Sequence, residues 1–122
     1  SVFPLLGYSD KPAVKVDFDL TEQDVALGQK LEMLLSIHSK NSQTQELVVD
    51  YRVWHVKSNG KITAKVYKWK NITLPARESV YLKKSHGFLQ LTTRKYYGGQ
   101  HTIEILINGV VYNQATMNLV LG

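Results

Sequence analysis

The chain has 122 residues, of which 43% are hydrophobic, and it carries a formal net charge of +5. This length and apolar content predict a single domain with its own hydrophobic core and are too small for two domains. The chain has no cysteine, no run of 18 or more apolar residues and no basic region before a long apolar N-terminal core, so we expect no disulfide, no thiolate metal site, no membrane contact and no signal peptide. We expect a monomer in the reducing cytoplasm.

The first twelve residues differ in character from the rest of the chain. They combine two prolines and a glycine with a cluster of apolar side chains. An exposed apolar segment at a terminus is unfavourable unless it docks against something. We therefore expect residues 1–12 to be an arm or linker from a preceding domain, and residues 13–122 to form the domain itself.

Alternation of apolar and polar residues predicts the first two strands. Residues 14–20 alternate strictly, with apolar side chains at every second position, which is the pattern of a half-buried strand. Residues 21–29 are polar and are expected to form a connection. The alternation then resumes over residues 31–37, a second strand.

Two asparagine-glycine pairs predict hairpins in the remainder. A β-rich strand over residues 47–57 is followed by Asn59-Gly60, the strongest short hairpin signal, and by a partner strand over residues 61–69. Further strands are expected over residues 79–86, 102–107 and 110–121. The last two of these flank Asn108-Gly109.

These strands predict an all-β fold. Seven strands at this spacing, without a convincing helical window, favour an immunoglobulin-like antiparallel β-sandwich over parallel α/β units. Trp54, on the third strand, is a candidate for the core tryptophan of such sandwiches, although an exposed position is equally compatible with the sequence. Tyr97, just before the penultimate strand, is likewise a candidate for a tyrosine that pins a corner.

Motifs for catalysis are absent from the sequence. The four histidines show neither His-x-His nor His-x3-His spacing, and no nucleophile elbow, P-loop or dinucleotide-binding motif is present. We expect no catalytic residue, no bound metal and no cofactor.

The charge distribution points to a polyanion partner. Residues 1–50 carry four basic and eight acidic side chains, whereas residues 51–103 carry eleven basic side chains and a single glutamate. Basic and aromatic residues occur together in two stretches. In residues 61–70, Lys61 and Lys65 share a strand face with Tyr67 and Trp69, and Lys68 and Lys70 extend the charge; in the segment Arg94 to Gly99, Arg94 and Lys95 directly precede Tyr96 and Tyr97. Lysines neutralise phosphates and aromatic rings stack on bases, although an ordinary exposed β-face has the same composition. Carbohydrate binding by the aromatics is a weaker alternative, because no acidic side chains accompany them.

Two stretches resemble a known family. VDYRVWHVKSNGKITAKVYKWK (Val49 to Lys70) and LKKSHGFLQLTTRKYYGGQHTIEILING (Leu82 to Gly109) are similar to the C-terminal immunoglobulin-like domain of AlkC-type alkylpurine DNA glycosylases, which are bacterial DNA alkylation repair proteins. The chain departs from that family at Ala64 and Gly98, where members tend to carry proline.

The resemblance implies a non-catalytic DNA clamp. The parent enzyme would remove cationic N3-alkylated bases such as 3-methyladenine in a helical-repeat domain that these residues lack, and the immunoglobulin-like domain would hold duplex DNA from the opposite side. Its partners would be duplex DNA and that helical-repeat domain. The alternative is a protein-interaction module that uses an exposed strand edge or its loops. The residues expected to contact phosphates or a groove are Lys57, Lys61, Lys65, Lys83, Lys84, His86, Arg94, Lys95, Tyr96, Tyr97 and Gly98.

Overall fold

Buried and exposed side chains alternate along the strands of the protein. The computed structural model describes residues 12–26, 28–56, 62–87 and 99–120, and these residues form eight strands and no helix. In β1, for example, Val14, Val16 and Phe18 are buried whereas the residues between them are exposed. The strand bounds are β1 Val14–Leu20, β2 Asp24–Ala26, β3 Lys30–Ser39, β4 Gln45–Val56, β5 Ile62–Leu74, β6 Ser79–Gly87, β7 Gly99–Ile107 and β8 Val110–Val120.

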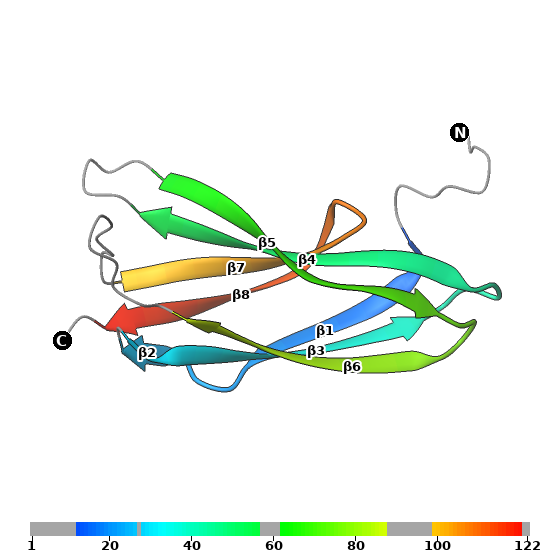
Figure 1. Cartoon of the computed structure of the whole chain (residues 1–122), viewed down its shortest axis with the longest axis horizontal. Helices are drawn as coiled ribbons and strands as arrows, with labels where there is room; N and C mark the ends of the chain where they lie inside the picture. Colours follow the sequence, from blue (N-terminus) through cyan, green and yellow to red (C-terminus); the bar gives the residue numbers. More distant parts are fainter. Residues whose placement is uncertain (1–11, 27, 57–61, 88–98, 121–122) are drawn as a thin grey trace.

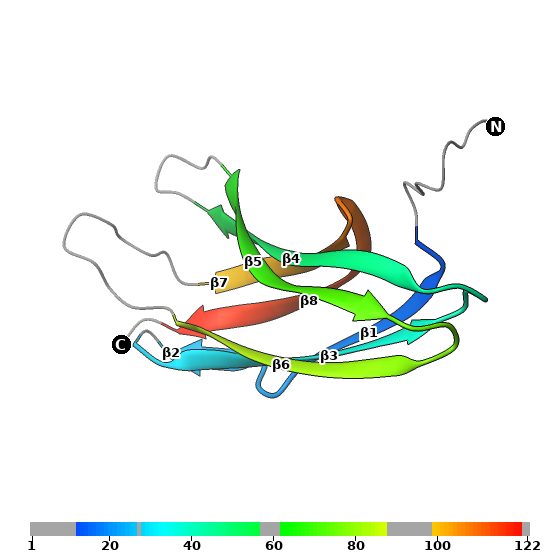
Figure 2. The ribbon, with the colours of Figure 1, turned by 45° about the vertical axis from the view of Figure 1, so that its right-hand side comes forward.

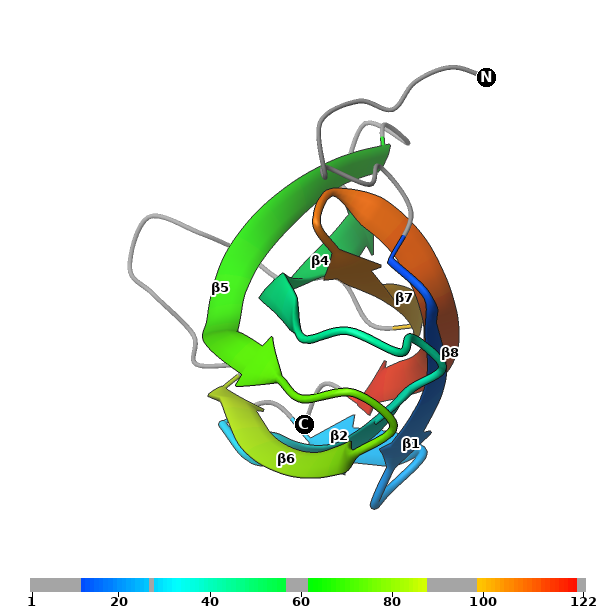
Figure 3. The same cartoon turned by 90° about the vertical axis from the view of Figure 1, so that its right-hand side faces the viewer.

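The strands form two sheets (Figure 1). A three-stranded sheet has the order β1-β3-β6, and a five-stranded sheet has the order β2-β8-β7-β4-β5. Figure 2 shows the two sheets as separate layers. In the end-on view, β1 lies beside β8 on one side of the sandwich, while the edge strands β5 and β6 lie on the other (Figure 3). The immunoglobulin-like all-β sandwich expected from the sequence is therefore confirmed.

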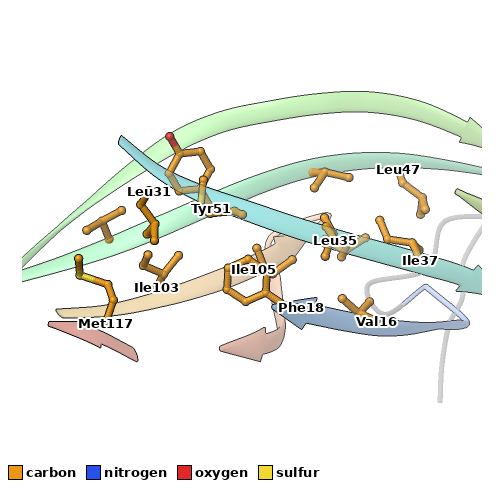
Figure 4. Close-up of a cluster of buried hydrophobic side chains, with 14 of the residues drawn as sticks. Val16, Phe18, Leu31, Leu35, Ile37, Leu47, Tyr51, Ile103, Ile105 and Met117 are labelled. Carbon is orange, nitrogen blue, oxygen red and sulfur yellow. The ribbon is translucent and has the colours of Figure 1, made fainter. Parts of the chain in front are cut away.

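The core lies between the two sheets. Figure 4 shows side chains of β1 and β3 pointing toward those of β4 and β7. Ile37, Val53, Ile103 and Ile105 have no exposed surface. Replacing a fully buried isoleucine or leucine with alanine typically costs about 2–5 kcal/mol, so these positions dominate the stability of the sandwich.

The β7–β8 hairpin has the turn that Asn108-Gly109 predicts. Asn108 and Gly109 both have positive φ angles, 51° and 84°, as a type I′ turn requires. The Asn108 amide donates to the carbonyl oxygen of Val48 at 2.9 Å, and its side-chain Oδ1 accepts from the Val48 amide at 2.7 Å. The side chain thus continues the β4–β7 ladder beyond the end of β7.

The strand count differs from the prediction of seven. Residues 24–26, which we expected to belong to a connection, form β2 and pair in parallel with residues 118–120 of β8. Val25 is 2% exposed and is part of the core. A three-residue strand with one buried side chain carries no alternation to detect, and its partner lies almost at the other end of the described chain.

Trp54, for which the sequence left a core and an exposed position equally open, does not lie in the core. Trp54 is half-buried on the outward face of β4, and Tyr51 and Val53 occupy the inward positions. The aromatic ring that β4 contributes to the core is therefore that of Tyr51, which is 2% exposed.

Among the described residues, no helix is long and apolar enough to cross a membrane.

Candidate nucleic-acid interface

Four strand ends converge at one end of the sandwich. The end of β4, the start of β5, the end of β6 and the start of β7 all lie at the left in Figure 1. Residues 57–61 and 88–98 connect these ends. Most of the predicted contact residues fall in these two segments and therefore lie outside the described residues; they are Lys57, Lys61, Arg94, Lys95, Tyr96, Tyr97 and Gly98.

The described lysines of the basic half lie on the two edge strands. β5 carries Lys65, Lys68 and Lys70, all exposed, and β6 carries Lys83 and Lys84. Both strands are sheet edges on the same side of the sandwich (Figure 3). The fold thus brings together charges that are separated in sequence, and it does so on strands that lead to the end described above.

These lysines differ in their surroundings. Lys83 is exposed, and its Nζ lies 3.4 Å from Oε2 of Glu32 on β3, an ion pair that is weak because both side chains are well solvated. Lys84 points the other way, to the inner side of β6, and is half-buried. The Nζ of Lys65 lies 5.2 Å from the centroid of the Tyr67 ring, a cation–π contact.

Aromatic rings from β4 and from the edge strands β5 and β6 form a cluster. Tyr67 stacks on Tyr51 at 5.1 Å, and Trp69 and His86 contact Tyr51 edge-on at 5.9 Å and 5.5 Å. The Tyr51 hydroxyl forms a 2.9 Å hydrogen bond with Nδ1 of His86. Burial, together with the neighbouring Tyr67, raises the pKa of Tyr51 to about 12.

Within this cluster, Tyr67, Trp69 and His86 have a structural role. Tyr67 and Trp69 are half-buried and pack against the core rather than standing on an exposed face. His86 is likewise half-buried, with its ring 4.8 Å from that of Tyr67. A phosphate contact by His86 stays a prediction.

The outward face of β4 and β7 carries a polar network. Oε1 of Glu104 accepts hydrogen bonds from Nε of Arg52 and Nε1 of Trp54, both at 2.7 Å. The Arg52 guanidinium also lies 5.3 Å from the centroid of the Trp54 ring. Desolvation raises the pKa of Glu104, but the hydrogen bonds from Trp54 and Arg52 and the charge of Arg52 outweigh it, so the pKa lies below its usual value. The positive charge of Arg52 is therefore balanced by Glu104 within the fold.

Sequence reasoning missed this network. Arg52 and Glu104 are Cα partners across the β4–β7 ladder, a pairing between residues 52 positions apart. The alternation of β4 places Arg52 and Trp54 on one face, but only the register with β7 reveals that Glu104 joins them. No group of three histidine or acidic side chains within the described ranges could hold a metal ion.

Comparison with known proteins gives matches in sequence and in structure. The family model described as "Uncharacterised protein YhaZ, C-terminal Ig-like domain" matches residues 15–121. The uncharacterized protein YhaZ of Bacillus subtilis (strain 168) is 33% identical over 109 residues, which are 88% of this chain and 30% of that protein. The chain thus spans about a third of the length of this relative.

The structural similarity extends to a DNA glycosylase. A structure of the Pseudomonas fluorescens alkylpurine DNA glycosylase AlkC, bound to DNA containing an abasic site analog, matches with a TM-score of 0.85 and 32% identity, over 90% of this chain and 31% of that one. A β-glucosidase from Listeria innocua matches over 89% of this chain and 16% of its own with a TM-score of 0.72 but only 12% identity, which shows a shared fold alone.

The resemblance to AlkC-type glycosylases that the sequence indicates is confirmed by these matches. Because the family model covers almost the whole described sandwich, the chain belongs to the family of YhaZ C-terminal immunoglobulin-like domains.

Proposed function

We propose that the chain is a non-catalytic module that holds duplex DNA in a DNA alkylation repair protein. The observation that carries this proposal is the match to AlkC, a glycosylase in complex with DNA, at a TM-score of 0.85 and 32% identity. The match covers 31% of AlkC, so the chain corresponds to one part of such a protein. We assign removal of the alkylated base, such as 3-methyladenine, to a helical-repeat domain elsewhere in the protein.

The distribution of charge supports contact with phosphates. The basic half of the sequence supplies the exposed lysines of β5 and the lysines of β6, and these strands lead to the segments 57–61 and 88–98. Lysine and arginine side chains bind DNA chiefly by displacing condensed counterions from phosphates. Arg94 and Lys95, beside Tyr96 and Tyr97, are the residues that we propose for the closest approach. Such a monomeric module would work in the cytoplasm, where a bacterial chromosome lies.

A comparison of two charge-matched variants tests which part of the chain meets DNA. The first variant combines Arg94→Ala with Lys95→Ala, and the second combines Lys15→Ala with Lys30→Ala, both exposed lysines of the three-stranded sheet. The affinity for a fluorescently labelled duplex is measured by anisotropy at low salt. We expect the first variant to bind about tenfold more weakly, because two phosphate contacts are lost, and the second to bind as the wild type does.

Two outcomes contradict the proposed contact region. Equal weakening in both variants would mean that DNA responds only to the total charge. If neither variant changed DNA affinity while the first lost binding to a separately produced helical-repeat domain, the chain would instead be a protein-interaction module.

A further inference from the structure

The outer face of the three-stranded sheet contains a hollow of about 300 Å³. Side chains from all three strands line it. In one cross-strand row Asp17 of β1, Ser36 of β3 and Tyr81 of β6 are neighbours, and in the next row Asp19, Leu34 and Lys83 are neighbours. The small Ser36 side chain stands between an aspartate and a tyrosine.

Apolar surface is exposed at this hollow. Tyr81 is 78% exposed, the largest exposed fraction among the large hydrophobic residues described, and Leu34 is 40% exposed. The ring of Tyr81 contributes to no core contact, unlike Tyr51 and Tyr67. An aromatic ring beside an aliphatic side chain on the outer face of a sheet is the kind of surface that binds a partner.

The opposite wall, on β1, carries two carboxylates. Asp17 and Asp19 are exposed, and within the described ranges they form neither a hydrogen bond nor an ion pair. Lys83, the cation at this hollow, has its Nζ 3.4 Å from Glu32. A ligand in the hollow therefore meets two carboxylates on the β1 side, and an aromatic ring together with the Lys83 side chain on the β6 side.

We propose that this hollow docks an arginine side chain presented by a partner protein. A guanidinium stacks on aromatic rings and forms paired hydrogen bonds with carboxylates, and the stem of an arginine packs on aliphatic surface. Asp17 and Asp19 would bind the guanidinium, while Tyr81 and Leu34 would cover its stem and one face. The two carboxylates repel phosphates, so DNA does not occupy the β1 side of the hollow. The hollow shares Lys83 and the outer side of β6 with the surface proposed for DNA, whereas Asp17 and Asp19 lie on β1, outside that surface.

The test uses the 122-residue chain and a blocked tetrapeptide, acetyl-Gly-Arg-Leu-Gly-amide. Backbone amide shifts are followed by NMR as the peptide is added. We expect saturable shifts at Asp17, Leu34 and Tyr81, with a dissociation constant on the order of millimolar, because a single side chain supplies most of the contact. The same peptide with citrulline in place of arginine keeps the shape without the charge and should bind about three- to tenfold more weakly.

Paired variants show whether the hollow itself is responsible. Asp17→Asn with Asp19→Asn should weaken binding of the arginine peptide about three- to tenfold, whereas Glu22→Gln with Asp24→Asn, which removes the same charge from exposed positions outside the hollow, should not. Tyr81→Phe should bind normally and Tyr81→Ala weakly, because the ring rather than the hydroxyl makes the contact. The proposal would be overturned if the citrulline peptide bound as tightly as the arginine peptide, or if both acidic pairs had equal effects. It would also be overturned if the shifts in the hollow depended on the concentration of the chain alone, which would make a second copy the occupant.

Discussion

Glu104 is the residue whose charge state matters most to the outward face of the five-stranded sheet. Its side chain is only 15% exposed, and its carboxylate binds both Arg52 and Trp54. The pKa of Glu104 is lowered in the folded state, so the folded state favours the ionised form. Its contribution to stability is therefore present above the pKa of an unfolded glutamate and is lost as the pH falls through the lower, folded pKa.

Replacement of this carboxylate should be visible in the pH dependence of stability. Glu104→Gln is expected to lower the free energy of unfolding at pH 7 by about 1–3 kcal/mol, because hydrogen bonds to a charged acceptor are lost. The difference from the wild type should shrink as the pH falls through the lowered pKa of the folded state, where the wild-type carboxylate takes up a proton. Urea titrations at pH 7 and along an acidic series measure it. Glu22→Gln, at an exposed position, is the control, and a difference between Glu104→Gln and the wild type that does not change with pH would contradict the network.

At the residue scale the sequence predicted burial well only where one face of a strand is clearly polar. In β1 the alternation of Val14, Val16 and Phe18 with charged residues leaves one possible inward face. In β4 apolar or aromatic residues occur on both faces, including Val53 and Trp54 in succession, so the pattern could not decide which one enters the core. The structure shows that Val53 does, because its partner Ile103 on β7 is also buried.

The turn of the β7–β8 hairpin depends on two separable properties of Asn108, its backbone conformation and its side-chain hydrogen bonds. Asn108 supplies a backbone conformation with φ of 51° and a side chain that bonds to β4. Asn108→Gly keeps the conformation and loses the side-chain bonds, whereas Asn108→Ala loses the bonds and also strains the turn.

We expect both variants to be less stable than the wild type. Asn108→Gly should cost about 1–2 kcal/mol, because the Val48 amide loses its acceptor. Asn108→Ala should cost about 1 kcal/mol more, because an alanine disfavours positive φ. Thermal and urea unfolding measure both values. If the alanine variant were the more stable of the two, the left-handed turn would not govern this hairpin.

Element boundaries followed from the sequence except where tertiary pairing extends a strand. β1 begins and ends where the alternation predicts. β5 runs to Leu74, five residues beyond the predicted end, because a register shift opposite Val49 and Asp50 allows pairing with β4 to continue past Trp69. A bulge of this kind breaks the alternation and is set by the partner strand, so it leaves no local signal.

The fold places the described lysines of the basic half on one side of the sandwich. The sequence predicted a basic half and an acidic half. It did not predict that β5 and β6 become neighbouring edges of different sheets, because that depends on the order of all eight strands. The positions of the candidate residues in 57–61 and 88–98 stay predictions.

In the longer protein, we propose that this domain holds DNA and that a helical-repeat domain removes the alkylated base. The 122-residue chain alone should release no 3-methyladenine from alkylated duplex DNA, because it is proposed to hold DNA and not to cleave the glycosidic bond. Chromatography of the bases released after prolonged incubation measures this, with a full-length AlkC-type glycosylase as the positive control. Release by the chain alone, above the rate of spontaneous depurination, would place catalysis in the sandwich.

Contact with DNA phosphates is the central claim, and the salt dependence of duplex binding by the wild-type chain tests it most directly. A domain of this size makes about three to five phosphate contacts, each of which contributes about −0.9 to the slope of log affinity against log salt concentration. The predicted slope is therefore about −2.7 to −4.5, with a dissociation constant of about 10⁻⁴ to 10⁻⁶ M at physiological salt. A slope shallower than about −1, or no binding of duplex DNA even at low salt, would contradict the account.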